Sequence, residues 1–156
     1  MFLSVKEFES IIRKTPMIAI DLCITNKESI LLGKRLNPPA KDTYFVPGGR
    51  IRKSEKINEA LKRIIYDETG RKIKDLQFLN FIGIYEHFYN DNFLGNSNFS
   101  SHYIVIAYSL SIECLTETEK DFKNNQHSDY IWVNYLNKSE LNIHPYTKAY
   151  FEKINL

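Results

Sequence analysis

Cysteine, tryptophan, proline and glycine are all scarce in this chain of 156 residues, which has two cysteines, one tryptophan, five prolines and six glycines. Cys23 and Cys114 lie in separate apolar segments and lack the spacing of zinc ligands. We therefore predict two buried free thiols in a reducing compartment rather than a disulfide framework or a zinc site. The chain also has no internal repeat, low-complexity tract or linker.

Strong net charge and long apolar runs are missing as well. The formal net charge of +2 and the lack of a basic stripe argue against nucleic acid or an anionic membrane as a partner. Apolar runs such as residues 103–108 are far shorter than a membrane span. The acidic residues near the N-terminus are not typical of a signal peptide. We expect a cytoplasmic protein that binds neither nucleic acid nor membrane.

What the chain does have is apolar and aromatic material. Hydrophobic residues make up 43% of the sequence and aromatic residues 13%, which is enough for a core and for stacking on a planar ligand. Because single cores commonly hold about 100–150 residues, we expect one domain over residues 1–156.

Apolar periodicity and punctuating residues predict an α+β fold with a mixed sheet covered by helices. Ser4 and Glu7 form a capping box, Gly70 ends a helix, and 47–49 (Pro-Gly-Gly) predicts a sharp turn. The predicted helices cover residues 4–14, 55–69 and 146–154, and the predicted strands cover residues 17–25, 29–35, 44–46, 76–86, 102–113 and 130–133.

The segment from Gly48 to Gly70 carries the chemistry. Two glycines follow a strand, and the helix after them has an apolar row, 57-61-65, that we expect in the core. Glu68 ends a second row that is otherwise apolar, near the two glycines, where a carboxylate can bind a hard cation such as magnesium. The alternative, a solvated face with favourable ion pairs, accounts for Glu59 and Arg63 but less well for acids in the last helical turn.

This segment resembles the signature of the Nudix family, in which a glycine, a glutamate, an Arg-Glu pair, a Glu-Glu pair and a final glycine stand at fixed spacing. Counted from Gly49, the matching residues are Glu55, Arg63, Ile65, Glu68 and Gly70. The sequence departs from the signature at Ile64, which replaces the first glutamate, at Asp67 and at Arg71. Without a carboxylate at position 64, the site should hold fewer cations than the full signature does.

Within the family, the reduced signature resembles that of the GDP-mannose mannosyl hydrolases. The likeness extends to residues 1–8, 31–40, 44–50, 83–93, 100–110 and 124–133. It implies the Nudix α/β/α sandwich with a mixed sheet, a homodimer, and one Mg²⁺ ion per site, which Mn²⁺ can replace. It also implies hydrolysis of a GDP-sugar, GDP-mannose or GDP-glucose, to GDP and free sugar, by attack of water at the anomeric carbon with inversion.

The resemblance assigns roles to individual residues. The metal ligands would be Gly48, Glu68 and Gln126. The catalytic residues would be His127 as general base, Arg35 and Arg50 as diphosphate clamps, and Tyr103. The substrate would contact Phe2, Leu3, Phe8, Asp21, Arg35, Arg50 and His87. Gly49, Glu55, Arg63 and Gly70 would be structural, with Arg63 orienting Glu55 or Glu68.

Plainer interpretations of several of these residues stay open. Leu3 and Phe8 can equally form the apolar face of the first helix, and His87 and Tyr103 can be packing residues. Asp21 lies in an apolar strand and needs a partner, which we expect to be a sugar hydroxyl or an arginine. The sequence leaves the contribution of Asp67 undecided and suggests no role for His144.

Two other functions remain possible. A nucleotide-sugar pyrophosphohydrolase would cleave a P–O bond, but that chemistry is supported by a full carboxylate cluster, and Ile64 argues against it. A nucleotide-binding sensor without turnover is the second alternative. Retention of Glu68, Gln126 and His127 together argues against a sensor.

Overall fold

The computed structural model describes residues 3–95, 98–116, 127–134 and 141–154. Its helices are α1 (Val5–Lys14), α2 (Ile57–Thr69) and α3 (Pro145–Phe151), with short 3-10 helices η1 (Leu76–Phe78) and η2 (Ile112–Cys114). The strands are β1 (Met17–Asn26), β2 (Ser29–Arg35), β3 (Tyr44–Phe45), β4 (Gly48–Arg50), β5 (Asn80–Tyr89), β6 (Ser101–Ser111) and β7 (His127–Asn134).

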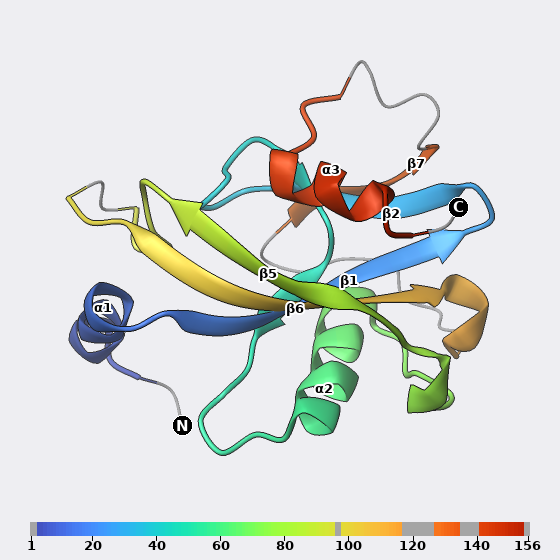
Figure 1. Ribbon diagram of the computed structural model, residues 1–156, viewed down its shortest axis with the longest axis horizontal. Coiled ribbons are helices and arrows are strands. Elements are labelled where there is room, and N and C mark those ends of the chain that lie inside the picture. Colours follow the sequence, from blue (N-terminus) through green and yellow to red (C-terminus); the bar gives the residue numbers. More distant parts are fainter. Residues whose placement is uncertain (1–2, 96–97, 117–126, 135–140, 155–156) are drawn as a thin grey trace.

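One mixed sheet joins these strands in the order β3-β2-β1-β6-β5, with β4 paired to β1 and β7 paired to β2. The β1–β6 pair is parallel and the others are antiparallel. Figure 1 shows α3 on one side of the sheet and α2 on the other, with α1 beside one end. The mixed sheet and the α/β/α arrangement expected from the sequence are confirmed.

Strand β1 lies between two hydrophobic clusters because helices cover both faces of the sheet. Its residues Ile20, Leu22 and Ile24 pack in the cluster that includes Ala60, Leu61, Ile64 and Ile65 of α2. Cys23 packs on the opposite side, in the cluster that includes Tyr150 and Phe151 of α3. Burial of both faces explains why β1 reads as an almost continuous apolar run. Asp21 lies two residues before Cys23 in the same strand, so its side chain is on the same side of the sheet as α3.

Several predicted boundaries are wrong. Helix α3 ends at Phe151 rather than at residue 154, and β7 begins at His127 rather than at residue 130. Helix α2 begins at Ile57 rather than at residue 55, and Ser54, just before the predicted start, has a left-handed φ of 64°. Ile57 is also 44% exposed, so the expected core row begins only at Leu61. The strand expected from Leu76 begins at Asn80, because residues 76–78 form η1.

The sharp turn predicted at residues 47–49 is wrong for its two glycines, which belong to a strand. Gly48 and Gly49 lie in β4, opposite Asp21 and Ile20 of β1, and neither has a left-handed backbone. A Cβ atom on Gly48 would lie 2.6 Å from the Ile20 carbonyl oxygen and 2.7 Å from Oδ1 of Asp21. Glycine is required at this position by the close approach of β1, and a tight turn does not explain it.

The cysteines are free in the structure, with Cys23 buried and Cys114 only partly buried. Among the described residues there is no helix with both the length and the apolar character of a membrane span.

Candidate functional site

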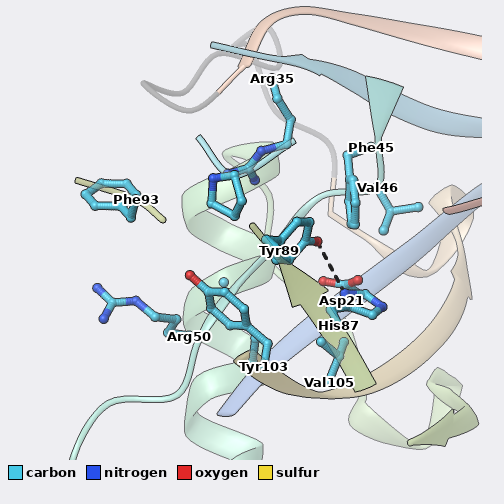
Figure 2. A pocket seen from close by; sticks show the side chains of 14 residues that line it. Asp21, Arg35, Phe45, Val46, Arg50, His87, Tyr89, Phe93, Tyr103 and Val105 are labelled. Atoms are coloured by element: carbon cyan, nitrogen blue, oxygen red, sulfur yellow. Dashed lines mark hydrogen bonds between the residues drawn. The ribbon is translucent and has the colours of Figure 1, made fainter. Parts of the chain in front are cut away.

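A polar cavity of about 170 Å³ opens where β4 lies against β1. It is lined by residues of the six strands β1 to β6 and of the loops after β2, β3 and β5. Figure 2 shows these side chains. Aromatic and aliphatic side chains form part of its wall, among them Phe45, Val46 and Val105. Its polar side chains are Asp21, Arg35, Arg50, His87, Tyr89 and Tyr103.

A second and larger hollow of about 700 Å³, which we call the box groove, lies beside α1 and α2. Leu3, Ile11 and Ile18 give it an apolar side, and Arg52, Lys53, Asp67 and Glu68 give it a charged side. Gly48, Gly49 and Arg50 line both the box groove and the polar cavity. Strand β4 is therefore the boundary at which the two hollows meet.

Asp21 is a buried acid with one tyrosine as its partner. The hydroxyl of Tyr150 in α3 donates a hydrogen bond of 2.7 Å to Oδ2 of Asp21. Burial raises the pKa of Asp21 to about 7, against the lowering effects of the Tyr150 hydrogen bond and the charge of Arg35, while Glu68 adds to the rise. Within the described residues the hydrogen-bond partner of Asp21 is therefore this tyrosine and not an arginine.

His87 is a buried imidazole held between aromatic rings. Its ring is stacked on Tyr146 at a centroid distance of 4.0 Å, and Nε2 lies 3.3 Å from the Tyr150 hydroxyl. On its other side Nδ1 lies 3.5 Å from the Tyr89 hydroxyl, the contact dashed in Figure 2. Burial, with a smaller contribution from His144, lowers the pKa of His87 to about 4. The ring is therefore neutral at physiological pH.

Two arginines bring positive charge to the polar cavity. Nε of Arg35 is buried and has no hydrogen-bond partner among the described residues. The guanidinium of Arg50 lies 4.0 Å from the centroid of the Phe8 ring, a cation–π contact that joins β4 to α1. Figure 2 shows Arg35 above Tyr89 and Arg50 to the left of Tyr103. A buried donor on a guanidinium favours an anionic ligand, since a phosphate oxygen would satisfy it.

Arg63 and Glu55 form a bidentate ion pair next to β4. Nε of Arg63 donates to Oε1 of Glu55 at 2.6 Å and a terminal nitrogen donates to Oε2 at 2.8 Å. The same terminal nitrogen also donates to the Arg50 carbonyl oxygen at 2.9 Å. The hydrogen bonds from Arg63 lower the pKa of Glu55 to about 2. Arg63 thus ties α2, the loop before it and β4 together, and its pair with the exposed Asp67 at 3.2 Å is peripheral.

Glu68 is the carboxylate best placed to bind a metal ion. It is 3% exposed and accepts a hydrogen bond of 2.6 Å from the hydroxyl of Tyr130 in β7. It lines the box groove together with Gly48. The described residues contain no group of three or more His, Cys, Asp and Glu side chains arranged to hold a metal. The available donors are oxygens, so the residues fit a hard cation that keeps water and substrate oxygens as its other ligands.

The structure brings most of the predicted site residues together. Asp21, Arg35, Arg50, His87 and Tyr103 line the polar cavity. Phe8 is buried in a small cluster with Ile12 and Met17, and 44% of Leu3 is exposed on the box groove. Phe2 and Gln126 fall outside the described residues, and of His127 the structure describes the backbone, which pairs with Arg35 at the start of β7.

The sequence alone did not point to Tyr150, Tyr146, Tyr89 or Tyr130 as site residues. Tyr150 and Tyr146 stand in a short C-terminal helix that reads as an ordinary closing helix. Tyr89 lies beyond the strand predicted over residues 76–86, and Tyr130 is the first residue of a predicted strand. No local pattern identifies the acid that a distant tyrosine contacts, so these partners become visible only once the chain is folded. His144, which had no predicted role, is the N-cap of α3 and accepts from the Tyr146 backbone NH.

Comparisons with known proteins agree with this geometry. A family model described as the NUDIX domain matches residues 15–151. The low-salt glycan biosynthesis protein Agl8 of Haloferax volcanii is 30% identical over 149 residues, covering 96% of this chain and 88% of that protein. An ADP-ribose pyrophosphatase of Methanocaldococcus jannaschii is 39% identical over 72 residues, covering 45% of this chain and 40% of that protein.

Solved structures of low sequence identity share the fold. A MutT NUDIX hydrolase from Burkholderia pseudomallei superposes with a TM-score of 0.70 at 18% identity, over 90% of this chain and 99% of that one. The NUDIX domain of Shewanella oneidensis NrtR, solved with ADP ribose, superposes with a TM-score of 0.65 at 13% identity, over 97% of this chain and 96% of that one.

Proposed function

This chain belongs to the Nudix family of hydrolases, and from that premise we propose that it is a magnesium-dependent hydrolase of nucleotide sugars. The proposed substrate is GDP-mannose or GDP-glucose. The proposed products are GDP and the free sugar, formed by attack of water at the anomeric carbon with inversion. The similarity to Agl8, whose name refers to glycan biosynthesis, is consistent with a sugar-containing substrate.

The observation that carries the proposal is that two hollows of different size and chemistry share strand β4. The polar cavity is small, and its acid, imidazole and phenols can exchange hydrogen bonds with sugar hydroxyls. The box groove is larger and has an apolar side on which a nucleoside can pack. A diphosphate that joins sugar to nucleoside would then cross β4, beside Arg50.

The two arginines account for recognition of the diphosphate. Nε of Arg35 is buried and has no hydrogen-bond partner within the described part of the chain, and Arg50, held against Phe8, lines both the cavity and the groove. Guanidinium groups match phosphate oxygens and stay charged at all relevant pH values. In the proposed complex they bind the diphosphate and stabilise the charge that it gains as it leaves.

The proposed metal ligands are the Gly48 carbonyl, Glu68 and Gln126, and the proposed general base is His127. Mg²⁺, or Mn²⁺ in its place, would neutralise charge on the diphosphate. His127 takes one proton from the attacking water, whose oxygen bonds to the anomeric carbon, while the bond from that carbon to the diphosphate oxygen breaks and GDP departs with the electron pair. The backbone pairing of His127 with Arg35 in β7 supports this assignment, because it brings the base's strand to the edge of the polar cavity.

The test is hydrolysis of GDP-mannose with Mg²⁺ in ¹⁸O-labelled water, with the products analysed by mass spectrometry. We expect the label on mannose and none in GDP. Label in GMP or in mannose 1-phosphate would instead indicate cleavage of a P–O bond, the reaction class suggested by the ADP-ribose pyrophosphatase relative. Binding of GDP without turnover of any nucleotide sugar would indicate a sensor.

A matched pair of variants separates recognition of the diphosphate from a general effect of charge. Arg35→Gln removes the guanidinium from the polar cavity, whereas Lys34→Gln removes a positive charge from the adjacent residue of β2, which is not part of the cavity lining. We expect kcat/KM to fall by about a hundredfold or more in the first variant, as for a lost charged contact of about 3 kcal/mol, and to change little in the second.

The resemblance extends the proposal to a homodimer, which light scattering after gel filtration would test. We also propose a cytoplasmic location, because free thiols such as Cys23 and Cys114 persist in reducing compartments.

A further inference from the structure

A chain of hydrogen-bonded polar side chains, buried except for the partly buried Tyr89, runs from the polar cavity to helix α3 and back. It starts at the Tyr89 hydroxyl, passes through both nitrogens of His87, and reaches the Tyr150 hydroxyl, which bonds to Asp21. Tyr150 is fully buried, and His87 and Asp21 are 3% and 7% exposed. Three of these residues line the cavity, but Tyr150 does not. Its hydroxyl acts on the cavity only through its two neighbours.

The hydrogens in this chain can be placed from chemistry. Above about pH 7 the carboxylate of Asp21 is ionised and only accepts, so the single hydrogen of the Tyr150 hydroxyl goes to Oδ2 of Asp21. The Tyr150 oxygen is then left as an acceptor, and at 3.3 Å it is satisfied by a hydrogen on Nε2 of His87. A neutral imidazole carries one hydrogen, so Nδ1 is an acceptor facing the Tyr89 hydroxyl.

Helix α3 also fixes His87 through Tyr146, which stands one helical turn before Tyr150. Its ring is stacked on the imidazole with an interplanar angle of 1°. Its hydroxyl accepts from the backbone NH of Phe88 at 2.9 Å and donates to the carbonyl of the same residue at 3.0 Å. Two tyrosines of one helix thus hold the ring and the backbone of β5 at the same place.

The hydrogen bond from Tyr150 fixes the orientation of the Asp21 carboxylate in the cavity. Because Tyr150 occupies Oδ2, the carboxylate of Asp21 cannot rotate freely, and Oδ1 stays beside Gly48, where a Cβ would come within 2.7 Å of it. From this geometry we propose that Tyr150 is a positioning residue of the active site, which orients the carboxylate of Asp21 toward the bound sugar and keeps His87 in the Nε2–H tautomer. This inference rests on the proposed function for the identity of the ligand as a sugar.

The substitution that tests it is Tyr150→Phe, which keeps the ring and removes the hydroxyl. We expect kcat for GDP-mannose to fall by about tenfold, as when a group that orients a functional side chain is lost, while KM stays within about twofold. Tyr85→Phe is the matched control, since its ring packs edge-on against Tyr150 at 4.9 Å and the variant leaves the Tyr150 hydroxyl in place. Equal effects of the two variants on kcat would overturn the inference.

A second measurement needs no substrate and no variant. In protein with ¹⁵N-labelled histidine, long-range ¹H–¹⁵N spectra distinguish the two neutral tautomers of an imidazole. At about pH 8 we expect His87 to show a protonated Nε2 and an unprotonated Nδ1, because its two partners dictate that arrangement. A protonated Nδ1 in the unaltered protein would overturn the inference, even if Tyr150→Phe failed to fold.

The same spectrum of folded Tyr150→Phe should show averaging between the two tautomers, and an unchanged His87 spectrum in that variant would contradict the inference. This readout also separates the two proposals. If no nucleotide sugar is hydrolysed but the spectra behave as expected, the proposed function fails and Tyr150 keeps its positioning role toward the same cavity. If sugar is hydrolysed and the spectra do not change, the positioning role fails alone.

Discussion

Substitution of the two adjacent glycines of β4 by alanine should have very different effects on stability. In Gly48→Ala the new methyl group would lie 2.6 Å from the Ile20 carbonyl oxygen and 2.7 Å from Oδ1 of Asp21. The first of these atoms is backbone in the centre of the sheet, so relief requires β1 and β4 to move apart. In Gly49→Ala the nearest atom is the Ile64 side-chain carbon Cγ1 at 3.2 Å, which a small change of rotamer can displace.

The expected magnitudes follow from two opposing effects. Overpacking a well-packed site costs about 1–3 kcal/mol, and the contact with backbone puts Gly48→Ala near the upper end. Replacing glycine by alanine at a compatible backbone also restricts the unfolded chain and returns about 0.4–1 kcal/mol. Neither glycine has a left-handed backbone, so this gain applies to both. We expect a net loss of about 2 kcal/mol for Gly48→Ala and a change within about 0.5 kcal/mol of zero for Gly49→Ala.

The assay is urea unfolding of both variants and the unaltered protein, monitored by circular dichroism with metal removed by EDTA, so that no ligand contributes to stability. The two free energies of unfolding should differ by about 2 kcal/mol at equal m-values. Equal stabilities for the two variants, or a less stable Gly49→Ala, would show that β1 and β4 are not packed as closely at Gly48 as the structure indicates.

Three further predictions concern single contacts. Tyr130→Phe removes the hydrogen bond of 2.6 Å to Glu68 and should raise the Kd for Mn²⁺, measured by titration, by about tenfold. An unchanged Kd would mean that Tyr130 does not support the metal site. Ala40→Gly should raise the melting temperature by a few degrees, because Ala40 has a φ of 62° and relief of about 1–2 kcal/mol of strain exceeds the entropy lost to glycine; a lower melting temperature would argue against a strained loop. Asp21→Asn removes a carboxyl whose pKa is raised from 3.8 to about 7, so the unaltered protein should lose stability relative to the variant as the pH rises through that window. The loss should be on the order of 1.4 kcal/mol per pH unit, and a pH-independent difference in urea unfolding would contradict the raised pKa.

The helices and the mixed sheet could be predicted because their signals are local. The capping box of Ser4 and Glu7 is present in α1, and Gly70 ends α2 with a left-handed φ of 67°. These features depend on neighbours a few residues away, which the sequence displays directly. The start of α2 was misplaced because it depends on a distant contact. Glu55 was expected inside the helix, but its carboxylate accepts two hydrogen bonds from the Arg63 guanidinium and one from the Arg52 backbone NH. These bonds hold the loop before α2 outside the helix.

The sequence names residues that the structure brings to one cavity, but it does not name their partners. Arg35, Arg50 and His87 stand far apart in the sequence. They were predicted to share a site because the chain resembles a known family, and no local pattern indicates it. The partner of Asp21 could not be inferred at all. Its carboxylate accepts a hydrogen bond from a tyrosine 129 positions later in the sequence. An acid in an apolar strand indicates only that it needs some partner. The sheet and α3 must both be in place before that partner is known.

The departure of Ile64 from the family signature has a structural explanation that involves Gly49. Ile64 is 1% exposed, packs among Ile20 and Leu22, and supports Gly49 of β4 from below. A glutamate at this position would place a carboxylate one helical turn before Glu68, which is itself 3% exposed, and in the absence of metal the two like charges would be buried close together. Isoleucine removes that repulsion and leaves Glu68 as the acid that the Tyr130 hydroxyl holds. The same substitution limits the carboxylates available for metal, so in the proposed reaction the arginines and the oriented groups of the polar cavity would supply more of the stabilisation.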